Sequence, residues 1–156
     1  MKANIGISEQ NTRAVAEILN KVLADEHLLY MKTRNYHWNI EGKSFLELHK
    51  FYEGQYKEIE EIIDLIAERI RYIGHYAEGR LKDFLKITHI AEEEYTNDQR
   101  TQIQNLLRDH ESIIISIRPN IDAINDEHKD AGTADFITGI MEQHEKMAWF
   151  LRSYLK

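Results

Sequence analysis

The sequence predicts an all-α fold: a bundle of four long helices, with a long crossover that carries a short helix between the second and the third. Two observations support this. Four segments repeat apolar residues every three or four positions, which is the period of an amphipathic helix. The 156 residues include one proline and seven glycines, too few for an all-β fold with many turns. No repeat or linker divides the chain, so residues 1–156 are expected to form a single domain.

The first helix is expected from Ser8 to about Trp38. Ser8 is a favourable N-cap, and Glu9 places a negative charge in the first turn, where it interacts well with the helix dipole. Gly42 lies just beyond the last turn and can end the helix. The apolar stripe along this helix comprises Val15, Ile18, Leu19, Val22 and Leu29.

The second helix is expected from Ser44 to Gly74, about 30 residues or ~45 Å long. Ser44 and Glu47 have the spacing of a capping box. The connection that follows, residues 75–94, is long enough to cross a bundle from end to end, and its segment 80–87 is expected to form a short helix. The apolar stripe of the second helix comprises Phe45, Leu48, Tyr52, Ile59, Ile62, Ile63, Ile66, Ile70 and Ile73.

The third helix is expected to begin near Thr96 or Asn97. Pro119 removes one backbone donor inside it. Because Ile121 and Ile124 keep the helical period, the sequence predicts a kink at Pro119 rather than the end of the helix.

A polar turn, residues 125–133, precedes the fourth helix, which is expected from about Thr133 to Tyr154. Four such helices with one long crossover fit a ferritin-like bundle. The apolar pattern alone fits a cytokine-like bundle or a helical adaptor as well.

Composition and charge restrict the function. The absence of cysteine excludes a disulfide scaffold, a thiolate zinc site, an iron–sulfur cluster and a cysteine nucleophile. Twenty basic and 27 acidic residues give a net charge of −7, which disfavours binding of nucleic acid over the whole surface. No signal peptide and no membrane span are visible, so a cytoplasmic protein without membrane contact is expected. Eight histidines suit iron or zinc.

Five side chains in the first two helices are candidate metal ligands. His49 and Glu53 lie four residues apart and share a helix face, and so do Asp64 and Glu68. His37 lies near the end of the first helix. Donor pairs at this spacing can converge on one cation. Taken alone, the Asp64 and Glu68 pair is more often a solvated, salt-bridged surface, and His37 alone is more often a packed histidine.

Helix geometry limits how these ligands can combine. His49 and Asp64 are 15 residues apart on one expected helix, which separates them by ~22 Å. Because metal–ligand bonds are about 2 Å long, the two cannot bind the same ion within one chain. Two copies of the helix packed antiparallel about a two-fold axis would bring His49 of one chain to Asp64 of the other, and a symmetric dimer would hold two such shared sites.

The alternative for a four-helix bundle is a di-iron centre inside one subunit. That centre needs Glu-x-x-His on two helices, and no glutamate of this chain has a histidine three residues later. The sequence therefore favours the shared site.

These residues lie in segments that resemble the Dps family, the ferritin-like "DNA-binding proteins from starved cells". The segments are LADEHLLYMKTRNYHWNIEGKSFLELHKFYEGQY at 23–56, DLIAERI at 64–70 and KMAWFLRSYL at 146–155. The resemblance is specific in its spacing: YHW, then LH twelve residues after the first histidine, then D-x-x-A-E-R fifteen residues after the second. It covers essentially the whole chain and implies a shell of twelve subunits built from two-fold dimers.

The resemblance implies that His37 and His49 come from one subunit, and Asp64 and Glu68 from its two-fold mate. Glu53 matches an acidic position one turn after the second histidine. The aromatic beside the site is matched by Trp38, for which ordinary interface packing is an equally good explanation.

The resemblance also implies an activity. The family oxidises Fe(II), with hydrogen peroxide as the preferred oxidant in most members, and stores Fe(III) as mineral inside the shell. Two histidines with two or three carboxylates suit Fe(II), and zinc is expected to compete for the same ligands. The expected protein is therefore a ferroxidase that stores iron and protects against oxidative damage.

Iron entry in the family uses acidic pores at three-fold axes. Asp126, Asp130 and Asp135 lie around the turn that matches the pore region, where a plain solvated acidic loop is the alternative. A charge of −7 per chain would sum to −84 over twelve chains, which favours attraction of Fe(II) at low salt.

The sequence gives little support for DNA binding. About seven residues precede Ser8, with Lys2 among them, and only Lys156 follows the last helix. Binding of phosphates needs several cations in each contact patch, so DNA binding is expected to be weak or absent. A DNA-compacting protein with little iron oxidation is the second hypothesis, and a metal-free helical interaction module is the third.

Overall fold

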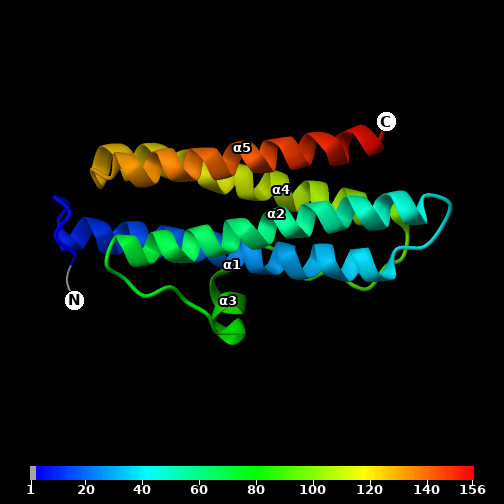
Figure 1. The fold of residues 1–156 in the computed structure, drawn as a ribbon, viewed down its shortest axis with the longest axis horizontal. Helices are drawn as coiled ribbons and strands as arrows, with labels where there is room; N and C mark the ends of the chain where they lie inside the picture. The colour runs from blue at the N-terminus through cyan, green and yellow to red at the C-terminus, as the bar shows by residue number, and fades with distance from the viewer. Residues whose placement is uncertain (1–2) are drawn as a thin grey trace.

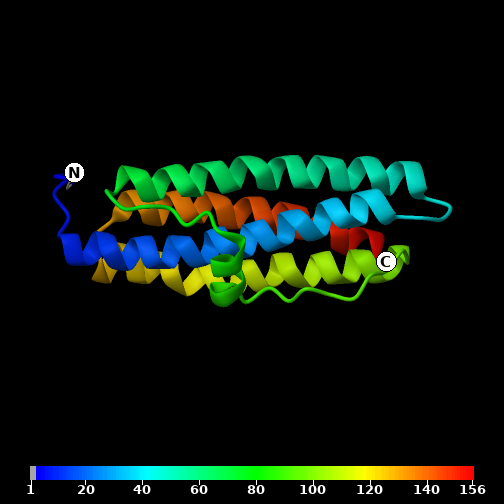
Figure 2. The same ribbon diagram turned by 90° about the horizontal axis from the view of Figure 1, so that it is seen from below.

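The computed structural model describes residues 3–156 and is a bundle of four long helices (Figure 1). These helices are α1 (Glu9–Asn39), α2 (Phe45–Tyr72), α4 (Gln99–Asp122) and α5 (Ala131–Tyr154). The pairs α1–α2 and α4–α5 are antiparallel hairpins that lie side by side (Figures 1 and 2). The predicted fold class and the four long helices are confirmed.

The crossover runs along the whole bundle, from the end of α2 to the start of α4 (Figure 2). It carries the expected short helix, α3 (Leu81–Ile87), which packs on α1. Phe84 of α3 is buried and stacks on His27, with the ring centroids 4.4 Å apart. Beyond α3, the buried carboxylate of Asp25 accepts hydrogen bonds from the Thr88 hydroxyl (2.7 Å) and the His89 backbone N–H (2.9 Å). The crossover is therefore anchored on α1.

The helix starts follow their capping residues. Ser8 accepts from the backbone N–H of Asn11, as predicted. The third long helix begins at Gln99, with Asp98 as its cap, and the fourth at Ala131, with Asp130 as its cap. The prediction of a capping box at the start of α2 was wrong, because Ser44 precedes α2 but its side chain makes no capping hydrogen bond.

The helix continues beyond Pro119, in agreement with the sequence. α4 extends to Asp122, and a π-helical turn, η1 (Ala123–Glu127), prolongs it by five residues. The turn then ends at Lys129, whose φ of 59° reverses the chain toward α5.

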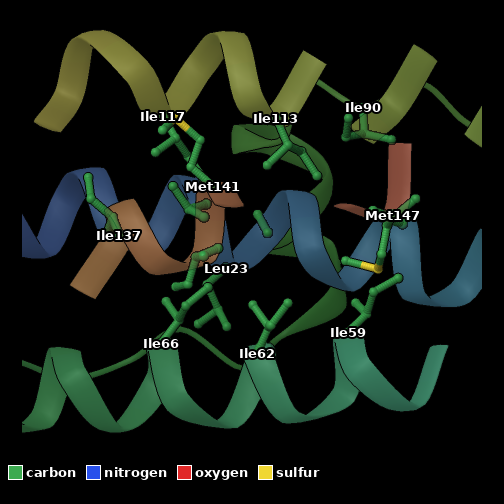
Figure 3. Packing of buried hydrophobic residues seen from close by; sticks show 14 of the residues in the cluster. Leu23, Ile59, Ile62, Ile66, Ile90, Ile113, Ile117, Ile137, Met141 and Met147 are labelled. Carbon is green, nitrogen blue, oxygen red and sulfur yellow. The ribbon is translucent and has the colours of Figure 1, made fainter. Parts of the chain in front are cut away.

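The core fills the space between the two hairpins with aliphatic side chains (Figure 3). α2 faces it with a run of isoleucines, and α4 and α5 contribute isoleucine and methionine from the other side. Because both hairpins bury the same core, each fixes the position of the other. The residues labelled in Figure 3 are Leu23, Ile59, Ile62, Ile66, Ile90, Ile113, Ile117, Ile137, Met141 and Met147.

The Phe84 anchor yields a prediction about stability. We expect Phe84→Ala to lower the free energy of unfolding by about 3 kcal/mol, because a fully buried aromatic ring is lost and a cavity remains. Leu85→Ala, at the exposed neighbouring position, is the control and should change it by less than ~0.5 kcal/mol. Urea unfolding measures both, and equal losses would show that Phe84 does not anchor the crossover.

Candidate metal centre

Two of the predicted ligands meet where α1 passes into α2. His37 lies in the last turn of α1 and His49 in the second turn of α2. Their rings stack with centroids 3.8 Å apart and an interplanar angle of 22°. The short connection between the helices thus brings together side chains that are twelve residues apart.

Reciprocal hydrogen bonds fix the orientation of both rings. Nδ1 of His37 donates to the backbone carbonyl of His49 (2.7 Å), and Nδ1 of His49 donates to the carbonyl of His37 (2.8 Å). A carbonyl only accepts, so each Nδ1 carries a proton, and in the neutral form of each ring Nε2 is the unprotonated nitrogen. Hydrogen bonds of this kind commonly orient the histidine ligands of metals. The pair therefore presents two Nε2 donor atoms.

Glu53 lies one turn after His49 on α2. The ammonium of Lys57 donates to its carboxylate (2.5 Å), and this hydrogen bond and charge lower the pKa of Glu53 below its usual value. Protonation of His37 or His49 would lower the pKa of Glu53 further. Glu53 is thus an anion at neutral pH beside the two histidines, in a position to join them as a ligand.

An aromatic cluster flanks the histidine pair. Tyr56 packs edge-on against His37, with ring centroids 5.3 Å apart. The guanidinium carbon of Arg34 lies 5.1–5.4 Å from the ring centroids of Tyr30, Trp38 and Tyr56. Trp38 itself is 54% exposed, so it lies beside the pair with much of its ring uncovered.

The two remaining ligands, Asp64 and Glu68, form a separate pair further along α2. Both side chains are exposed, and the Tyr72 hydroxyl donates to Glu68 (2.7 Å), which raises the pKa of Tyr72. α2 is one uninterrupted helix, so His49 and Asp64 are separated by ~22 Å, as expected. Within residues 3–156, no three histidine, aspartate or glutamate side chains converge to hold a metal ion. The predicted ligands therefore lie in two separate groups within one chain.

The three aspartates assigned to the iron-entry pore have different environments. Asp126 in η1 and Asp135 in α5 are exposed. Asp130 is buried: it accepts from the backbone N–H and the hydroxyl of Thr133 and from the Arg69 guanidinium. Both oxygens of Asp130 are engaged in capping α5, so Asp126 and Asp135 are the better candidates for contact with ions.

Sequence reasoning missed several partners of the ligands. Lys57 and Tyr72 each lie four residues after a ligand on the same helix, a spacing that would have revealed them. Arg34 and Tyr56 come from different helices, and no local pattern links them.

Comparisons with known proteins show the family to which the chain belongs. The model of the ferritin-like domain matches residues 16–156. The chain is 34% identical to DNA protection during starvation protein 2 of Bacillus anthracis, covering 92% of this chain and 97% of the relative. Its structure superposes on the Dps protein of Vibrio cholerae with a TM-score of 0.94 and 32% identity, covering 99% and 97% of the two chains. The chain belongs to the Dps family.

Another relative is a low temperature-induced protein of Nostoc sp., which is 41% identical over 99% of this chain and 87% of its own length. The Vibrio cholerae protein is described as a member of a broad superfamily of ferritin-like diiron-carboxylate proteins. In the Dps chain described here, no helix within residues 3–156 has the length and apolarity needed to cross a membrane.

Proposed function

We propose that this Dps protein is a ferroxidase and an iron store. It oxidises Fe(II), preferably with hydrogen peroxide, at sites shared between two-fold-related subunits, and keeps Fe(III) as mineral inside a hollow shell. The observation that carries the proposal is the division of the ligands: a preoriented histidine pair and a carboxylate pair lie ~22 Å apart on one rigid helix. A second chain completes both half-sites.

The outer face of α2 is compatible with pairing to its own copy. Antiparallel packing that puts His49 opposite Asp64 of the partner subunit also puts Glu53 opposite Glu60 of the partner subunit. Lys57, close to the midpoint of this register, then lies between acidic side chains of both subunits and offsets their repulsion. Exposed Leu46 and Leu65 supply apolar surface for the same contact.

The ligand set suits the proposed reaction. Iron is the substrate, bound by Nε2 of the two histidines and by carboxylates, a combination of donors that Fe(II) accepts. Two Fe(II) ions each give one electron to a hydrogen peroxide molecule. Its O–O bond breaks, and it takes up two protons and leaves as two water molecules. The hard carboxylate oxygens stabilise the Fe(III) that forms, and Zn(II) is the expected competitor.

The assembly and cell biology belong to the same proposal. Twelve subunits, arranged as two-fold dimers, would enclose the store in the cytoplasm, and acidic pores with Asp126 and Asp135 would admit iron. The family name and the starvation-protection relative support a role in stress. DNA compaction is the second candidate function, favoured by the name of the family and by the name of that relative.

The first prediction concerns oxidation. After anaerobic loading with Fe(II), we expect a peroxide pulse to form Fe(III) much faster than air does. Glu68→Ala should slow the reaction at least ~10-fold, because one ligand of the shared site is lost. Glu142→Ala, which changes an exposed glutamate of α5, is the control and should leave the rate unchanged. Absorbance of Fe(III) measures the rates, and wild-type oxidation no faster than in buffer would refute the proposal.

The second prediction tests sharing between subunits. His49→Ala and Glu68→Ala are each expected to be inactive. In a mixed dimer of the two variants, one site loses both ligands and the other keeps both. Dissociation and reassociation of an equal mixture should therefore recover about a quarter of the wild-type rate. No recovery after verified mixing would place the whole site within one subunit.

The third prediction separates iron chemistry from DNA binding. At neutral pH, we expect no gel shift of duplex DNA at physiological salt and at most a weak one at low salt, because the net charge of −7 opposes binding to phosphates. A shift that persists at physiological salt would favour DNA compaction instead.

A further inference from the structure

Three ionisable side chains lie in contact at the centre of the bundle, away from the candidate metal centre. Nδ1 of His110 (α4) and Nδ1 of His144 (α5) are 2.8 Å apart, and Nε2 of His144 lies 2.7 Å from the Glu26 carboxylate (α1). All three residues are fully buried. We call Glu26, His110 and His144 the core triad. It links α1 of one hairpin to both helices of the other.

The geometry limits the protons that the core triad can hold. The Glu26 carboxylate accepts, so Nε2 of His144 donates to it, and the contact between the two Nδ1 atoms needs one shared proton. Two neutral imidazoles satisfy both hydrogen bonds. A further proton then has one available nitrogen, Nε2 of His110, which is buried and has no hydrogen-bond partner among the described residues. A second added proton would have to bind Nδ1 of His144, and it would set two N–H groups against each other at 2.8 Å.

The surroundings of the core triad offer no compensation for added charge. The neighbouring charges are already paired: Asp25, beside Glu26, contacts His89, and Asp109, beside His110, contacts Lys32. The residues that α2 buries are all uncharged. Burial keeps the pKa of His110 well below its ordinary value of 6.5, and protonation of His144 would lower it further.

We propose that the core triad is an acid-sensitive clamp between the two hairpins. It holds α1 to α4 and α5 while both histidines are neutral, and it resists the protons that the unfolded chain would bind. Below about pH 6.5 the unfolded chain takes up a proton at His110 and the folded chain does not, so the folded state loses stability as the pH falls. The inference does not depend on the proposed ferroxidase.

Hydrogen exchange of the assembled, iron-free protein tests the clamp. Mass spectrometry would follow the peptides around residues 110 and 144 at pH 7.5 and 5.5, with rates corrected for intrinsic exchange. Each proton excluded from the folded state is worth up to about tenfold in protection per pH unit. We expect wild-type protection to fall at least ~10-fold between these pH values.

Two variants should have different effects on the ratio of protection at pH 7.5 to protection at pH 5.5. In His110→Gln the side-chain amide can donate a hydrogen bond to the neutral ring of His144. After the amide flips, its oxygen can accept one from the protonated ring. The loss of protection between pH 7.5 and 5.5 should therefore be about tenfold smaller than in the wild type. In Glu26→Gln a protonated ring of His144 has no negative charge beside it. The loss of protection between pH 7.5 and 5.5 should therefore be at least as large as in the wild type. A purely structural role would lower protection at both pH values without changing their ratio.

His128→Gln, at a half-buried histidine outside the core triad, is the matched control and should behave like the wild type. An unchanged ratio in His110→Gln would overturn the clamp, and so would a smaller acid-induced loss in Glu26→Gln. Because only ratios within one variant are compared, a general loss of stability in either variant does not affect the conclusion.

Discussion

The length and continuity of α2 govern the arrangement of the candidate site. A helix advances ~1.5 Å per residue, so one that carries His49 near its start and Asp64 near its end holds them far beyond the span of any metal centre. Its buried isoleucines fix which face points outward, and the ligands lie on that outer side. A site that needs both groups would therefore have to be made by two chains.

Rigid placement of the histidines complements that constraint. Each ring is held by the backbone of the other helix, so His37 and His49 are oriented before any ion binds. Glu53 has no such support. Its partner, Lys57, is an exposed side chain that a metal ion can replace at little cost. The half-site thus combines two fixed nitrogens with one adjustable carboxylate.

The sequence predicted the helices well because their apolar period is strong, and it predicted the separation of the ligands because that distance follows from helix geometry alone. It failed at Ser44, whose backbone (φ −98°, ψ 23°) is not in the extended conformation typical of an N-cap. It could not show the mutual hydrogen bonds of His37 and His49, which depend on how two helices meet. It also could not reveal the core triad, since Glu26, His110 and His144 are brought together only by tertiary packing.

Buried polar contacts determine how the two hairpins meet. Satisfied buried polar contacts specify a single arrangement more strictly than aliphatic packing alone. Lys32 with Asp109, Tyr36 with Asn105, and Glu26 with His144 each join α1 to the opposite hairpin. A slide of one turn would leave these groups buried without partners, at a cost of several kcal/mol. The same contacts that set the register of the bundle thus hold α1 and its His37 in place, and where the contact is ionisable, that register becomes sensitive to pH.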